Sequence, residues 1–221
     1  RQPASFCGVL GFKPTYGRVS RWGLIAYASS FDQIGPFSNN VEDTALIMEV
    51  IAGSDQYDST VSSLDVPNFS AELNQPIKKL KIAYLKDCLD NPSIDKEVKE
   101  QMLQSIEKLK ELGHQLEAVE FPLINYMVPT YYILTTAEAS SNLSRYDGIH
   151  FGYRSKEAND IPSTYKQSRS QGFGLEVKRR IMLGTFVLSA GYYDAYYTKA
   201  QKVRQLIKKR TDQDFDNYDF I

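Results

Sequence analysis

The hydrophobic pattern along the chain is clearest between residues 80 and 121. Residues 80–85 and 115–121 are short runs with alternating or continuous apolar positions, and each predicts a strand. Between them, residues 95–112 place apolar side chains at helical spacing, and Gly113 follows as a stop signal. That apolar face consists of Val98, Met102, Ile106, Leu109 and Leu112. Strand, helix and strand in this order predict a right-handed crossover in a parallel or mixed sheet.

Glycines and prolines punctuate residues 1–40 so densely that this region predicts short strands and turns and no helix. Residues 40–53 predict a helix that Asn40 caps, with acidic residues in its first turn and Gly53 closing it. The polar residues 54–75 predict an excursion over the surface.

Helical patterns dominate the chain from about residue 126 to residue 209, with breaks predicted at Gly148, Pro162 and Gly172. Combined with the strand–helix–strand unit, they predict an α/β fold with a mixed β-sheet flanked by helices on both faces. The tyrosines of the last helical stretch recur four positions apart, which is typical of helix packing. They are Tyr192, Tyr193, Tyr196 and Tyr197.

Composition narrows the class of protein. The 221 residues are 42% hydrophobic and 24% charged, as in ordinary globular proteins, and no apolar run is long enough to span a membrane. A net charge of −1 leaves no broad basic field for binding nucleic acid directly. Cys7 and Cys88 are too few for a disulfide framework and suit a reducing cytoplasm. His114 and His150 have no partner at ligand spacing, so we expect no metal site.

No serine of the chain has an evident base beside it, although a serine hydroxyl needs one to act as a nucleophile. The serines in predicted loops are Ser29, Ser30, Ser62 and Ser63. We expect these side chains to cap turns.

Three strings near the start resemble the amidase signature family. Arg1-Gln-Pro-Ala matches the end of that family's Gly/Ser-rich signature, and the match continues through residues 11–20 and through Phe31-Asp-Gln-Ile-Gly-Pro36. Family members usually carry an arginine shortly after the Gly-Pro pair, where this chain has Phe37-Ser-Asn-Asn40. The resemblance implies that the chain is the central portion of a single amidase domain, lacking the N-terminal catalytic part and the C-terminal end.

Residues 138–148, 179–189 and 191–204 resemble one branch of the family, the glutamine-hydrolysing A subunits of tRNA-dependent amidotransferases. The resemblance implies a Lys–Ser–Ser triad before Arg1 and no catalytic residue in the chain itself. Because the family's lysine comes upstream, Lys13 and Arg18 are expected to be structural. The resemblance implies glutamine as substrate, with ammonia passing to a B subunit that uses ATP and magnesium on Glu-tRNA(Gln). The other partners would be a C subunit, which holds the complex together, and tRNA(Gln), which this subunit would engage only through the complex. It also implies no membrane, no cofactor in this subunit, and the cytoplasm as compartment.

Tyr131 and Arg180 align, by the same resemblance, with the family positions that recognise free glutamine. An arginine suits the α-carboxylate, because its planar fork donates two parallel hydrogen bonds. Helical spacing places Arg180 about 60° from the centre of an apolar stripe and Arg179 nearly opposite. The stripe consists of Val177, Ile181, Gly184 and Leu188. There are two alternatives. Arg179 and Arg180 could be an ordinary solvated pair on a helix, and Tyr131 could simply pack beside Tyr132.

Two other functions are compatible with the sequence. The chain could belong to a stand-alone amidase of the same family that acts on small or aromatic amides, which have no carboxylate for Arg180 to pair with. It could also be a non-catalytic fragment folded for contact with a partner subunit. We expect this chain alone to hydrolyse no amide, because the resemblance implies that the nucleophile and the base lie outside it.

Overall fold

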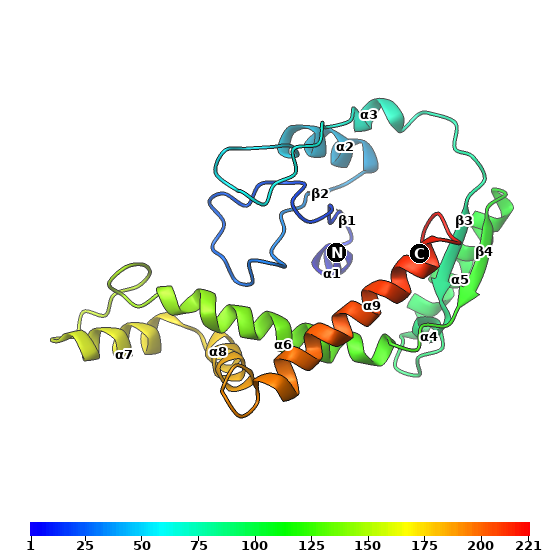
Figure 1. Ribbon diagram of the computed structural model, residues 1–221. Helices are drawn as coiled ribbons and strands as arrows, with labels where there is room; N and C mark the ends of the chain where they lie inside the picture. Colours follow the sequence, from blue (N-terminus) through cyan, green and yellow to red (C-terminus); the bar gives the residue numbers. More distant parts are fainter. The chain divides into compact units, whose positions relative to one another are not determined.

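The computed structural model describes residues 1–221 (Figure 1). The chain divides into two compact units. Unit 1 comprises residues 1–76 and 138–182, and unit 2 comprises residues 77–137 and 183–221. Two helices, α6 (Ile124–Asn142) and α8 (Leu175–Val187), contribute residues to both units.

Unit 1 begins with a short helix that the sequence did not predict, α1 (Gln2–Cys7). The density of prolines and glycines misled the prediction, because Pro3 lies in the first turn, where its missing N–H costs nothing. Gly8 ends the helix in a left-handed conformation, with φ of 65°. The strands predicted in this region are confirmed as an antiparallel pair, β1 (Leu10–Gly11) with β2 (Phe37–Ser38).

Helix α2 (Val41–Ile51) confirms the helix predicted after Asn40, whose side chain accepts a hydrogen bond from the Asp43 N–H at 2.7 Å. The predicted stop is confirmed. The helix ends at Ile51 with Ala52 as its C-cap, and Gly53 follows at once with φ of 116°, where its N–H donates to the Arg18 carbonyl at 3.1 Å. Residues 54–75 form a surface stretch containing only the short helix α3 (Phe69–Glu72).

The second part of unit 1 contains a single 3₁₀ turn, η1 (Leu143–Arg145), and the helix α7 (Ile161–Gly172). Pro162 was predicted to break a helix, but it lies in the first turn of α7 and helps to start it. Asp160 and Ser163 form a reciprocal capping box there. The breaks at Gly148, with φ of 83°, and at Gly172, the last residue of α7, are confirmed.

Unit 2 contains the predicted strand–helix–strand unit. Strands β3 (Lys81–Leu85) and β4 (Gln115–Val119) pair in parallel, with Lys81 opposite Gln115 and Leu85 opposite Val119. The short helix α4 (Lys86–Leu89) follows β3, and α5 (Lys96–Glu111), capped by Asp95, packs against β4 (Figure 1). The last residues of the chain extend this sheet in parallel, because the Ala83 N–H donates to the Phe220 carbonyl at 2.8 Å.

The apolar face predicted for α5 is only partly covered. Ile106 is 5% exposed, whereas Val98 is 52% and Leu112 is 66% exposed. A sheet of two paired strands is too narrow to cover a helix of 16 residues, so the ends of the face remain open. The buried centre of this unit includes Ala83 and Phe121.

The tyrosine-rich stretch of unit 2 packs as predicted. It forms a π-helical turn, η2 (Asp194–Thr198), that continues into α9 (Lys199–Phe215). The rings of Tyr193 and Tyr197 lie 5.1 Å apart between centroids, and those of Phe186 and Tyr192 lie 4.3 Å apart. These tyrosines therefore stabilise the turn by packing their rings, tilted, against neighbouring rings.

The predicted α/β class is confirmed, and the strands form one antiparallel pair and one parallel pair in place of a single mixed sheet. That the chain is part of a single amidase domain stays a prediction, because two compact units can belong to one domain. None of the helices combines the length and the apolar character that a membrane span requires.

We expect the 221-residue chain, expressed by itself, to self-associate. Large apolar side chains lie open on both units, among them Phe6 at 80%, Val50 at 83% and Ile77 at 73% exposure. Exposed apolar surface of this kind promotes association. Size-exclusion chromatography with light scattering, over a range of concentrations, measures it. A monodisperse monomer at all concentrations would contradict the expectation.

Candidate functional site

Arg180 lies on the part of α8 that belongs to unit 1, and its side chain is more buried than that of its neighbour. The Arg180 side chain is 31% exposed and that of Arg179 is 68% exposed. Gly184, on the predicted apolar stripe of α8, is buried. The prediction that helical periodicity turns Arg180 inward and Arg179 outward is therefore confirmed.

The Arg180 guanidinium has two side-chain partners in unit 1. Its Nε donates to Glu176 Oε1 at 3.0 Å, one helical turn earlier, and its Nη1 donates to the Tyr27 hydroxyl oxygen at 3.3 Å. The guanidinium also lies 5.8 Å from the centre of the Tyr27 ring. The hydrogen bond with Tyr27, followed by that with Glu176, raises the pKa of Arg180 above its ordinary value. Arg180 is therefore a fixed positive charge.

The guanidinium retains donors beyond these two bonds. An arginine side chain has five N–H groups, and the bonds to Glu176 and Tyr27 use one on Nε and one on Nη1. The remaining N–H groups, on Nη1 and Nη2, can donate in parallel to one carboxylate. Because the side chain is partly exposed, a small anion from solution can reach it.

Tyr27 is held in place through its backbone. Its N–H donates to Asp32 Oδ2 at 2.8 Å, and its carbonyl accepts a hydrogen bond from Asn142 Nδ2 at 3.2 Å. Ser30 lies three residues after Tyr27 in the same loop. Its N–H, at 3.0 Å, and its hydroxyl both donate to the Glu138 carboxylate. Glu138 and Asn142 lie four positions apart on α6, so one helix face holds the loop at two points.

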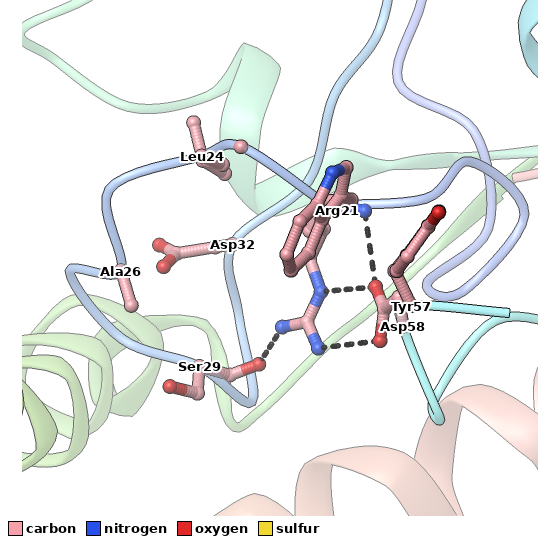
Figure 2. A pocket seen from close by; sticks show the side chains of 9 residues that line it. Arg21, Leu24, Ala26, Ser29, Asp32, Tyr57 and Asp58 are labelled. Carbon is pink, nitrogen blue, oxygen red and sulfur yellow. Dashed lines mark hydrogen bonds and ion pairs between the residues drawn. The ribbon is translucent and has the colours of Figure 1, made fainter. Parts of the chain in front are cut away.

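A second arginine of unit 1, Arg21, lines a pocket of about 260 Å³, drawn in Figure 2. Its Nε donates to Asp58 Oδ2 at 3.2 Å, its Nη1 donates to the Ser29 carbonyl, and its Nη2 donates to Thr60 Oγ1 at 2.7 Å. The side chains of Arg21 and Asp58 are 15% and 9% exposed. Because each nitrogen of this guanidinium already has a protein acceptor, Arg21 is a structural clamp and not a ligand site.

The wall of the same pocket carries an aromatic pair. The rings of Trp22 and Tyr57 stack with centroids 4.7 Å apart, and both residues are more than half exposed. Asp32 also lines the pocket (Figure 2), but both of its carboxylate oxygens accept hydrogen bonds from the backbone N–H groups of Tyr27 and Ala28. The pocket therefore offers aromatic surface but no free charge.

Tyr131, the other predicted site residue, lies on the part of α6 that belongs to unit 2. It is 47% exposed, and its ring meets the edge of the Tyr132 ring with centroids 5.5 Å apart. Its carbonyl accepts a hydrogen bond from Thr135 Oγ1 at 2.8 Å. Because Tyr131 and Arg180 belong to different units, a site shared by the two stays a prediction.

The serines act as loop contacts in the structure. Ser29 Oγ accepts from Asn142 Nδ2 at 3.0 Å, and Ser62 Oγ accepts from the Leu64 N–H at 3.3 Å. Ser30 is the only one of the four predicted loop serines bonded to a carboxylate, that of Glu138, which also binds the Ser30 N–H. A carboxylate is a weak base for a hydroxyl, and this double contact is the geometry of a loop clamp.

The remaining polar candidates also have structural partners. Lys13 Nζ donates to the Pro14 carbonyl at 2.8 Å, and Arg18 donates to the Leu64 and Asp65 carbonyls at 2.8 and 2.6 Å. The chain contains no group of three or more His, Cys, Asp and Glu side chains that could hold a metal ion. Both cysteines are free and exposed.

Sequence reasoning missed three residues of this arrangement: Tyr27, Glu138 and Asn142. The signal for two of them was present, because Glu138 and Asn142 are four residues apart in a predicted helix and so share a face. Tyr27 had no such signal. It lies in a loop, and its contact with Arg180 joins positions 153 residues apart.

Comparison with known proteins identifies the group to which these features belong. The family described as Amidase matches residues 1–221. The A subunit of glutamyl-tRNA(Gln) amidotransferase is 55% identical in Staphylococcus aureus and 57% identical in Bacillus pumilus, in each case over the whole chain and 45% of the relative. The crystal structure of the same subunit from Thermotoga maritima is 42% identical, with a TM-score of 0.74, over 99% of this chain and 42% of that one. The chain thus spans about half the length of the relatives it matches.

Proposed function

The chain belongs to the amidase family, and we propose that the full-length protein is the glutamine-hydrolysing subunit of a glutamyl-tRNA(Gln) amidotransferase. The ammonia released would convert Glu-tRNA(Gln) to Gln-tRNA(Gln). The observation that carries this proposal is the identity of 55% and 57% to such subunits across all 221 residues. Support from the site comes from Arg180, a partly exposed cation with free donors in a family that cleaves amides.

The role we assign to this chain in the reaction is to hold the substrate. Arg180 would bind the α-carboxylate of glutamine through two parallel, charge-assisted hydrogen bonds, which orient the molecule as well as bind it. Tyr131 would contact the other polar groups through its hydroxyl. Fixing the substrate in this way brings its side-chain amide to the attacking group and lowers the entropic part of the barrier.

The residues that attack the amide would lie outside this chain, in the Lys–Ser–Ser triad that the family resemblance implies. The loop serines support this assignment, since Ser29 and Ser62 accept backbone or amide hydrogens and Ser30 is clamped by Glu138. A serine nucleophile needs a base aligned with its hydroxyl, and none of these three has a lysine or histidine partner.

We further propose that this subunit itself uses no cofactor. ATP and magnesium would be used by the B subunit, the C subunit would complete the complex, and tRNA(Gln) would be engaged indirectly. The cytoplasm is the proposed compartment, which the two free thiols suit.

Two alternatives to this function remain, and the environment of Arg180 argues against the first of them. An amidase for small apolar amides has no carboxylate to pair with, so a partly exposed guanidinium with free donors would have no purpose there. The other alternative is a non-catalytic fragment folded for contact with a partner subunit, and an assay of this chain beside the longer parent separates it from the proposed function. Assay of the full-length protein with glutamine and with a simple aromatic amide separates these cases.

We expect this 221-residue chain alone to release no ammonia from glutamine above background. The full-length protein with its partner subunits should release ammonia and amidate Glu-tRNA(Gln). A coupled assay for ammonia on both preparations tests the proposal. A full-length complex that hydrolyses neither glutamine nor asparagine would refute the function. Turnover by the short chain that survives repurification would show that the catalytic residues lie within it.

A further inference from the structure

We propose that Tyr27 is a second donor to the carboxylate of the substrate, acting beside Arg180 as a specificity-determining residue. This inference rests on the proposed function, because it assumes that Arg180 binds the α-carboxylate of glutamine. Its own basis is the contact between the Tyr27 hydroxyl and Arg180 Nη1 at 3.3 Å, within unit 1.

The direction of that hydrogen bond determines what Tyr27 can do next. A guanidinium has only donors, so the Tyr27 oxygen must be the acceptor. The hydroxyl hydrogen of Tyr27 is then free to donate to a different group. A hydroxyl hydrogen beside a fixed positive charge points to an anion, and a carboxylate has two oxygens to accept from both donors.

The two partners of Arg180 differ in this respect. Glu176 accepts from Nε, has no hydrogen to offer when ionised, and carries a negative charge that repels a carboxylate. Tyr27 accepts from Nη1, at the end of the guanidinium where the unused N–H groups lie. Glu176 therefore orients Arg180 from one side, and the ligand binds on the side of Tyr27.

The loop that carries Tyr27 is rigid enough for recognition. Its N–H is bonded to Asp32 at 2.8 Å and its carbonyl to Asn142 at 3.2 Å, while Glu138 holds Ser30 through two hydrogen bonds. A donor whose backbone is fixed at both ends loses little entropy when it binds a ligand. The position of Tyr27 is thus fixed by the hydrogen bonds of its own loop and does not depend on the contact with Arg180.

The test compares glutamine with 4-aminobutanamide, which is glutamine without its α-carboxylate. In the full-length complex, Tyr27→Phe removes only the hydroxyl oxygen and hydrogen. We expect kcat/KM for glutamine to fall at least about tenfold, mainly through KM, because a hydrogen bond to a charged group is lost. Activity on 4-aminobutanamide, and tRNA amidation with free ammonia, should stay within about twofold of the wild type, since neither involves the carboxylate.

Tyr16→Phe is the matched control. The Tyr16 hydroxyl belongs to the same unit and donates to the Ser29 carbonyl at 2.9 Å, so its removal loosens the same loop without touching Arg180. We expect the ratio of the two kcat/KM values to remain that of the wild type. A ratio does not depend on the fraction of folded enzyme, so partial misfolding of either variant cannot imitate the effect.

The outcomes separate this inference from the function on which it rests. Equal losses on both substrates in Tyr27→Phe, or no loss on either, would overturn the inference and leave Tyr27 a packing residue. If Arg180→Ala also keeps the wild-type ratio, the carboxylate is bound elsewhere and both assignments fail. A wild-type complex without glutaminase activity would refute the proposed function itself.

Discussion

Replacing Arg180 with alanine in the full-length protein is expected to reduce glutamine use by at least about tenfold, and by up to about a hundredfold. The range follows from hydrogen bonds to charged groups, which contribute about 1.5–3 kcal/mol, with each 1.4 kcal/mol equal to a factor of ten. The substrate carboxylate would lose its cation, and Glu176, with which Arg180 pairs at 3.0 Å, would add an unbalanced negative charge nearby. Steady-state kinetics with glutamine measure the effect.

Arg179→Ala is the control for that measurement. Arg179 is on the same helix and contacts the same Glu176 at 3.7 Å, but its side chain is 68% exposed. Such an exposed pair contributes little, so we expect a change of less than about threefold. Free ammonia bypasses the glutamine site, and amidation with ammonia should survive in both variants. Equal behaviour of the two variants, or loss of both nitrogen donors together, would show that Arg180 holds the fold and does not bind glutamine.

Asp58→Asn should lower the free energy of unfolding of the full-length protein by about 3 kcal/mol, the range in which a buried ion pair loses one partner. Asp58 accepts from the backbone N–H and the Nε of Arg21 at 3.0 and 3.2 Å (Figure 2). It also accepts from Thr60 Oγ1 at 2.7 Å. The variant leaves the Arg21 charge largely buried without its counter-ion. Urea unfolding followed by circular dichroism measures the loss.

The control for Asp58→Asn is an ion pair that is exposed to solvent. Glu107 and Lys110 lie 2.8 Å apart on α5, with side chains 67% and 44% exposed. We expect Glu107→Gln to change the free energy of unfolding by less than about 1 kcal/mol. Comparable losses in the two variants would mean that the Arg21–Asp58 pair is not the clamp that its burial indicates.

The same pair predicts a pH dependence. Hydrogen bonds from Arg21, and next from Thr60, hold the pKa of Asp58 well below its ordinary value in the folded chain. Its contribution to stability is therefore complete above the unfolded pKa of about 4, and it is lost as the pH falls from there toward the lower folded pKa. The stability difference between wild type and Asp58→Asn should shrink between about pH 5 and pH 2. A difference that stays constant over this range would contradict the assignment.

Local patterns were sufficient for much of the fold. The strand–helix–strand unit was predictable because the period of apolar positions changes from strand to helix and back, and Asp95 and Gly113 mark the ends of α5. The same periodicity separated Arg180 from Arg179, since adjacent residues of a helix point about 100° apart. Helix α1 was missed because a proline in a first turn has the opposite meaning from a proline inside a helix.

The family, the α/β class and the inward-facing position of Arg180 could all be read from the amino-acid sequence, because they depend on neighbours in the chain and on motif strings. The surroundings of Arg180 could not. Its contact with Tyr27 joins positions 153 residues apart, and the loop of Tyr27 is held by Asn142, 115 residues away from it. Which loop meets which helix depends on packing across the whole unit, and no local period of side chains records it. For the same reason Arg21 and Arg180 look alike in the sequence, yet one has an acceptor for each of its nitrogens and the other keeps donors free.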